Sequence, residues 1–164
     1  MQTDKAKGTI LDYLITEEDR RDILSLLSDV EENLFKTDDS LKNVIGSNAR
    51  FGRILTEFLP PDWQSPESSE TIGSMIMGIK NEIVAIPTVN VVLAIMANEK
   101  ILSMLESFAR DELGKKVLFK IDVNPDIIGG AIFIIDGNYL DFSLLRKLNE
   151  AAIQKRDQIN ALIG

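Results

Sequence analysis

Two adjacent glycines, Gly129 and Gly130, are the residues of this sequence that first suggest ligand chemistry. Glycine-rich loops can hold a phosphate when their backbone N–H groups converge on it at the start of a helix. No GxxxxGK(S/T) or GxGxxG pattern surrounds this pair, and the apolar run 131–135 after it has the composition of a strand. The pair therefore indicates positive φ angles or a close backbone approach rather than nucleotide binding.

Carboxylates form the second group that could do chemistry, because they bind hard cations and act as general acids or bases. The pairs Glu17-Glu18 and Asp38-Asp39 occupy expected helix starts, where acidic side chains already stabilise the helix dipole. Four further aspartates lie close together in the sequence, but their spacing does not match an EF-hand loop: Asp122, Asp126, Asp136 and Asp141. We therefore predict no metal site and no cofactor.

The residue types that most often carry catalysis are missing from this chain. It contains no histidine and no cysteine. A Ser-His or Cys-His nucleophile pair, a His-ligated zinc and thiol chemistry are therefore impossible. The sequence predicts a protein that is not an enzyme.

Charge and hydropathy narrow the classes of partner. The net charge of −8 argues against nucleic acid and anionic lipid, which attract basic surfaces. No apolar run reaches the length that crosses a membrane, so direct membrane insertion is not expected. The acidity is uneven, with a balance of −7 over residues 1–70 and −1 over 71–164, which favours two modules.

The first module, residues 1–86, has the apolar spacing of an all-α bundle with about five helices. Its first helix is expected within residues 3–15, and its last over 70–85. The segment 60–69 contains three of the five prolines and predicts a linker that is neither helix nor strand.

The second module, residues 87–164, is expected to be a small β-α-β-β-α unit, so that the whole chain is α+β. Strands are predicted at 88–95, 117–123 and 131–135, with a helix at 97–113 that ends at Gly114. A long helix should run from about residue 143 towards 162, and both helices should lie on one face of the sheet.

The second module carries a motif that resembles the C-terminal signature of the F-type ATP synthase delta subunit, whose mitochondrial counterpart is the oligomycin-sensitivity-conferring protein. The motif is an amide, a proline, a Gly-Gly turn, an apolar strand, a glycine turn, Asp-x-Ser and a leucine-rich helix. Its residues here are Asn124, Pro125, Gly129, Gly130, Gly137, Asp141 and Ser143. The resemblance covers roughly residues 86–150, and Pro125, Gly129, Gly130 and Gly137 are interpreted as structural turn residues.

The chain departs from the family pattern in several places. The interval from Gly137 to Asp141 is one residue shorter than usual, and Leu145 stands where the family commonly has an arginine. The N-terminal module is also shorter than the family's six-helix bundle. These differences suggest a divergent member, or alternatively an E-type peripheral-stalk subunit of a V/A-type ATPase.

The resemblance implies a non-catalytic stator subunit in the peripheral stalk of a rotary ATP synthase, which takes part in ATP synthesis and proton transport through protein–protein contacts. Its helical module would bind N-terminal helices of the alpha subunits, and its C-terminal module would hold the b-subunit stalk helices. It would be a peripheral membrane protein on the cytoplasmic, matrix or stromal face. Two interpretations compete with this one: an unrelated helical protein-binding adaptor and, in third place, an enzyme that uses only Asp, Glu and Lys side chains. We expect the stalk contact to use the final helix, through Leu144, Leu148, Ala151 and Ala152.

Overall fold

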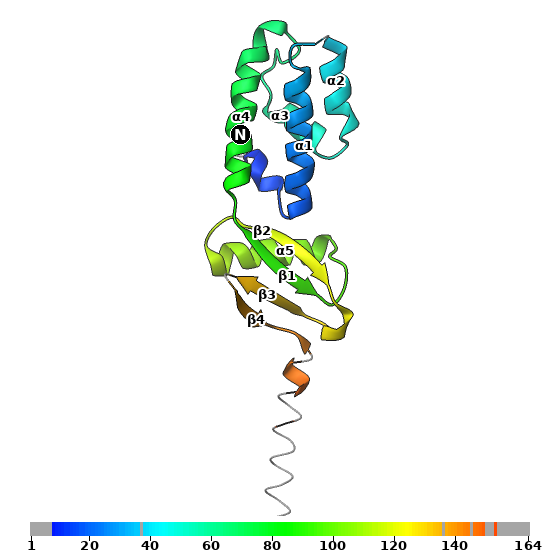
Figure 1. The fold of residues 1–164 in the computed structure, drawn as a ribbon, viewed down its shortest axis with the longest axis vertical. Coiled ribbons are helices and arrows are strands. Elements are labelled where there is room, and N and C mark those ends of the chain that lie inside the picture. The colour runs from blue at the N-terminus through cyan, green and yellow to red at the C-terminus, as the bar shows by residue number, and fades with distance from the viewer. Residues whose placement is uncertain (1–7, 37, 136, 145, 150–152, 154–164) are drawn as a thin grey trace, which may run out of the picture. The chain divides into compact units, whose positions relative to one another are not determined.

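The structure is a computed structural model that describes residues 8–36, 38–135, 137–144, 146–149 and 153. The chain divides into two compact units, residues 1–86 and 87–164. The first unit is built from helices, and the second contains a four-stranded sheet with a helix against it (Figure 1). The predicted α+β class is therefore confirmed.

Unit 1 is a bundle of four α-helices (Figure 1). The helices are α1 (Glu17–Asn33), α2 (Asp38–Ser47), α3 (Phe51–Phe58) and α4 (Ser69–Ala85). The helices bury their apolar stripes in the bundle. Leu14, just after the 3₁₀ turn at residues 10–13, is one of the largest fully buried side chains of unit 1, and the others come from α1, α3 and α4: Ile23, Leu27, Val30, Phe51, Leu55, Ile72, Ile76 and Ile83. The bundle thus has a core of its own.

Local sequence explains where α1 begins. The Thr16 hydroxyl accepts a hydrogen bond from the Asp19 N–H at 3.2 Å, and the Asp19 carboxylate accepts one from the Thr16 N–H at 2.9 Å. This reciprocal capping box satisfies two N–H groups that the helix itself cannot pair. Arg50 also forms an ion pair with Asp19, which ties the start of α1 to the segment before α3.

Two predictions for unit 1 were wrong in detail. The helix expected within residues 3–15 is only a 3₁₀ turn, η1 (Ile10–Tyr13), among the residues described there. The 60–69 segment is not wholly irregular, since it contains the 3₁₀ turn η2 (Pro66–Ser68) and the first residue of α4. Proline is compatible with the first turn of a helix, because its missing N–H would have had no partner there.

Unit 2 is built on a mixed sheet with the strand order β2-β1-β3-β4. The strands are β1 (Thr88–Leu93), β2 (Leu118–Val123), β3 (Ala131–Ile135) and β4 (Asn138–Asp141). β1 runs parallel to β2 and antiparallel to β3, and β3 and β4 form an antiparallel hairpin. The parallel pair requires a crossover, which α5 (Glu99–Phe108) provides.

Helix α5 lies across one face of this sheet (Figure 1). Asn98 caps its start by accepting a hydrogen bond from the Ile101 N–H at 3.0 Å. The helix continues into a π-helical turn, η3 (Ala109–Leu113), and ends at Gly114, whose φ of 61° is left-handed. The predicted helix and its glycine stop are therefore confirmed, although the helix begins at Glu99 rather than at residue 97.

The fourth strand was not predicted, because only a glycine turn and an Asp-x-Ser motif were expected after the strand at 131–135. β4 is a short edge strand with one of its edges unpaired among the described strands, and Tyr139 and Leu140 on it are exposed. Such a strand lacks the alternation of buried and exposed residues from which strands are predicted. β1 also ends at Leu93, two residues earlier than expected.

The final helix can be described only at its start. Leu144 and residues 146–149 are helical, as is residue 153. The remaining residues expected to continue this helix towards 162 lie outside the described part of the chain.

Candidate partner-binding groove

A groove of about 840 Å³ runs between α5 and the strands of unit 2. One side is formed by α5 and η3, and the other by the end of β1, the start of β3, the turn before β3 and the segment after β4. The residues that line and define the groove come from these places: Leu93, Ala94, Ile95, Ile101, Met104, Leu105, Phe108, Glu112, Ile128, Gly129, Gly130, Ala131, Phe133 and Phe142.

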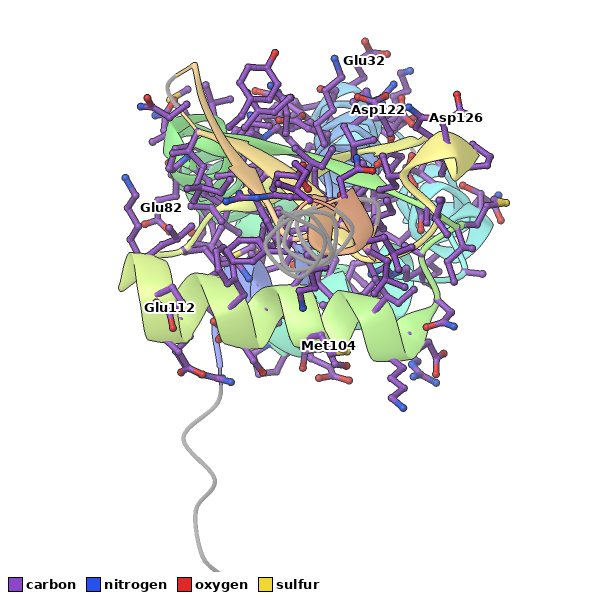
Figure 2. The ribbon with its side chains drawn as sticks, turned by 90° about the horizontal axis from the view of Figure 1, so that it is seen from below. Glu32, Glu82, Met104, Glu112, Asp122 and Asp126 are labelled. Carbon is purple, nitrogen blue, oxygen red and sulfur yellow. The ribbon has the colours of Figure 1, made fainter. Side chains whose placement is uncertain are left out.

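The groove is almost entirely apolar, and Glu112 is the one charged residue among those that line it. Figure 2 shows Glu112 and Met104 on the helix formed by α5 and η3. Large apolar side chains stand open to solvent here: Met104 is 64% exposed, Ile128 58% and Phe142 52%. Exposed apolar side chains gathered in one hollow are typical of a binding surface rather than of an ordinary monomer surface.

Three aromatic rings give the groove a rigid base. Phe133 of β3 stacks on Phe108 of α5, with ring centroids 4.4 Å apart. The Phe142 ring meets Phe133 edge-on at 6.0 Å. Such contacts hold rings in fixed orientations, so the exposed side of Phe142 is presented in a defined position.

The turn that closes one end of the groove depends on unusual backbone angles. A 3₁₀ turn, η4 (Pro125–Ile127), is followed by Ile128 with a φ of 64° and Gly130 with a φ of 82°. A Cβ atom on Gly130 would collide with the Phe142 carbonyl oxygen and lie 3.0 Å from Ser143 Cα. Gly130 therefore supplies both a left-handed conformation and room for the returning chain.

The start of the final helix is attached to this turn by hydrogen bonds. The Leu144 N–H donates to the Gly129 carbonyl at 2.9 Å, and a Cβ on Gly129 would lie 2.8 Å from Leu144 Cδ1. The Asp141 carboxylate accepts a hydrogen bond from the Ser143 N–H at 2.8 Å. Hydrogen bonds from the hydroxyl and the N–H of Ser143, with a smaller contribution from Arg146, lower the pKa of Asp141.

The described residues hold no arrangement that could bind a metal ion, since no three acidic side chains converge in that part of the chain. Within the groove, Glu112 is the one titratable side chain among the lining residues. What this geometry can do is bury apolar surface contributed by another segment.

A scan against protein-family models matches residues 70–154 to the ATP synthase delta (OSCP) subunit family. That match covers slightly more than half of the 164 residues. The chain belongs to this family. The resemblance inferred from the Gly-Gly motif is thereby confirmed, and the E-type alternative loses its support. A search of curated proteins returned no match.

Membership in the delta (OSCP) family implies a non-catalytic subunit in the peripheral stalk of an ATP synthase. The matched region begins in α4 and includes all the residues that line the groove. In the described part of the chain, no helix is long and apolar enough to cross a membrane.

The residues singled out in the sequence fall into three groups. Gly129 and Gly130 line the groove, and Pro125 opens the η4 turn beside it. Gly137, with a φ of 78°, lies in the β3–β4 connection and is not part of the lining. Leu144 and Leu148 are exposed, at 48% and 57%, so neither belongs to the core of the described residues.

Ala151 and Ala152, also expected in the stalk contact, lie outside the described residues. The sequence interpretation missed Met104, Phe108 and Phe142 as groove residues. One signal was available in the sequence, because the apolar face of α5 is broader than a single sheet contact requires. This face comprises Ile101, Met104, Leu105 and Phe108. Phe142 had no signal, because its position depends on β4.

Proposed function

We propose that this chain links the catalytic head of an ATP synthase to its peripheral stalk, and that the groove of unit 2 receives an amphipathic helix of the stalk b subunit. The observation that carries this proposal is the open apolar groove in the module that the delta (OSCP) family match covers. A helix that lays its apolar face into such a groove is a common mode of recognition.

The expected gain can be estimated from the exposed side chains. Fully burying a Met, Ile or Phe side chain contributes about 1.5–3 kcal/mol, and Met104, Ile128 and Phe142 are each slightly more than half exposed. Covering the three would contribute about 1 kcal/mol each, before the cost of association is subtracted. These side chains can therefore contribute measurably to affinity.

The start of the final helix would extend the same contact. Leu144 and Leu148 are four residues apart and thus lie on one side of a helix. Leu144 contacts the Gly129 turn, which itself lines the groove. We include both leucines in the proposed b-subunit contact, and Ala151 and Ala152 remain part of this proposal from the sequence alone.

For unit 1 we propose contact with N-terminal helices of the alpha subunits. Met77 and Val84 of α4 are 60% and 64% exposed and stand seven residues apart, hence on one side of the helix. The net charge of −7 over residues 1–70 would attract a basic amphipathic helix. In this arrangement the protein is peripheral to the membrane, on the cytoplasmic, matrix or stromal face that carries the catalytic head.

A titration with a peptide from the C-terminal part of the b subunit tests the groove. Met104→Asp places a charge in the groove and should weaken binding at least about tenfold, which corresponds to about 1.4 kcal/mol. Met96→Asp is the matched control, because Met96 is 81% exposed but does not line the groove. Isothermal titration calorimetry that gives equal affinities for both variants would reject the groove as the site.

A further inference from the structure

The covalent connection between the two units is very short. Unit 1 ends at Ile86, β1 begins at Thr88, and only Pro87 stands between them. The carbonyl groups of Ile86 and Pro87 are adjacent in the chain, yet each is held by a different unit.

On the unit 1 side, three contacts hold Ile86. Its N–H donates to the Ile83 carbonyl at 3.3 Å, and its side chain is buried at 8% exposure. Its carbonyl oxygen accepts a hydrogen bond from Arg20 Nη2. Arg20 is itself fixed on α1, because its side chain is largely buried and Nη1 lies 3.1 Å from Glu17 Oε1. The peptide group between Ile86 and Pro87 is therefore attached to α1 as well as to α4.

On the unit 2 side, the next peptide group belongs to the sheet. The Pro87 carbonyl accepts a hydrogen bond from the Leu118 N–H at 2.9 Å. Leu118 is fully buried and opens β2, opposite Thr88 in the parallel pair. The peptide group between Pro87 and Thr88 therefore moves with β1 and β2.

Only the two backbone torsions of Pro87 lie between these two peptide groups. Peptide groups are planar, and the pyrrolidine ring fixes the φ of proline near −65°. We propose that the connection is a single-axis joint, in which the ψ of Pro87 is the one soft torsion. Arg20 acts as a clamp in this joint, because its hydrogen bond to the Ile86 carbonyl restrains the ψ of Ile86. The covalent connection then permits rotation about one axis and resists bending about others. This inference does not depend on the proposed partners.

Distances between spin labels on the two units test the joint, and the absence of cysteine from the sequence makes labelling simple. Ser74→Cys in α4 and Lys100→Cys in α5 place one label on a helix of each unit. In this background, Arg20→Met removes the hydrogen bond to Ile86 and the ion pair with Glu17 but keeps an unbranched apolar side chain. It releases the ψ of Ile86 from this hydrogen bond and leaves only the steric restriction that the following proline imposes, so the distribution of distances should broaden.

Arg21→Met is the matched control. Arg21 is the next residue of α1, and its side chain is exposed. Among the described residues its one ion pair is local, with Nη2 lying 2.9 Å from Glu18 Oε1. A distribution of label distances that broadens with Arg20→Met but not with Arg21→Met supports the role of Arg20. Distributions of equal width in the two variants overturn it. If circular dichroism shows that Arg20→Met does not fold, Pro87→Gly decides, because it frees φ while leaving Arg20 in place. An unchanged distribution in Pro87→Gly also overturns the proposal.

Discussion

Replacing Gly130 with alanine tests how the turn beside the groove is built. The left-handed conformation at a φ of 82° costs an alanine about 1–2 kcal/mol. The new Cβ would also collide with the Phe142 carbonyl and press on Ser143 Cα, and overpacking of this kind costs about 1–3 kcal/mol. We therefore expect Gly130→Ala to destabilise unit 2 by roughly 2–5 kcal/mol.

Gly137→Ala separates these two costs. Gly137 has nearly the same φ, 78°, but a Cβ there would meet nothing within 4 Å. The Gly137→Ala variant should therefore lower the stability of unit 2 by only about 1–2 kcal/mol. Amide hydrogen exchange of β1 and β3 measures the opening free energy of unit 2, and amides of α1 in the same molecule provide an internal reference. Equal losses in the two variants would refute the idea that Gly130 is required for the close approach of residues 142 and 143.

Three further substitutions give direct tests of the packing and the helix start. Gly78→Ala on the open side of α4 should stabilise unit 1 by about 1 kcal/mol in urea unfolding, because a Cβ there meets nothing. Gly52→Ala should instead destabilise it by about 1–3 kcal/mol, since its Cβ would strike the Ile45 carbonyl. The pKa of Asp141 is lowered in the folded protein, so its stabilising effect is present above the ordinary value of 3.8 and is lost as the pH falls below it. Unit 2 of an Asp141→Asn variant should accordingly show a flatter acid-unfolding profile than the unchanged chain.

The sequence predicted those parts of the fold whose signals are local. The helix start at Glu17-Glu18, the Gly114 stop and the apolar spacing of the N-terminal helices each depend on residues within a few positions of one another. The family motif around Gly129 and Gly130 is equally local. Features of this kind can be recognised without knowing the tertiary structure.

Features that depend on distant contacts could not be predicted. β4 is a strand because it pairs with β3, and its residues remain partly exposed, so no alternation of polarity marks it. The groove combines α5, the turn before β3 and Phe142, which lie up to about 40 positions apart in the sequence. The hydrogen bond from Arg20 to Ile86 spans 66 positions, and an arginine near a helix start gives no sign of it.

The most direct test of the central claim is to recover this chain with its partners from the native membrane fraction. An affinity tag at the N-terminus, gentle detergent extraction and mass spectrometry would identify the proteins that are retained. The account predicts recovery of the alpha and b subunits of an ATP synthase, with the b subunit lost when residues 130–164 are deleted. Recovery of the intact chain without any ATP synthase subunit would contradict it.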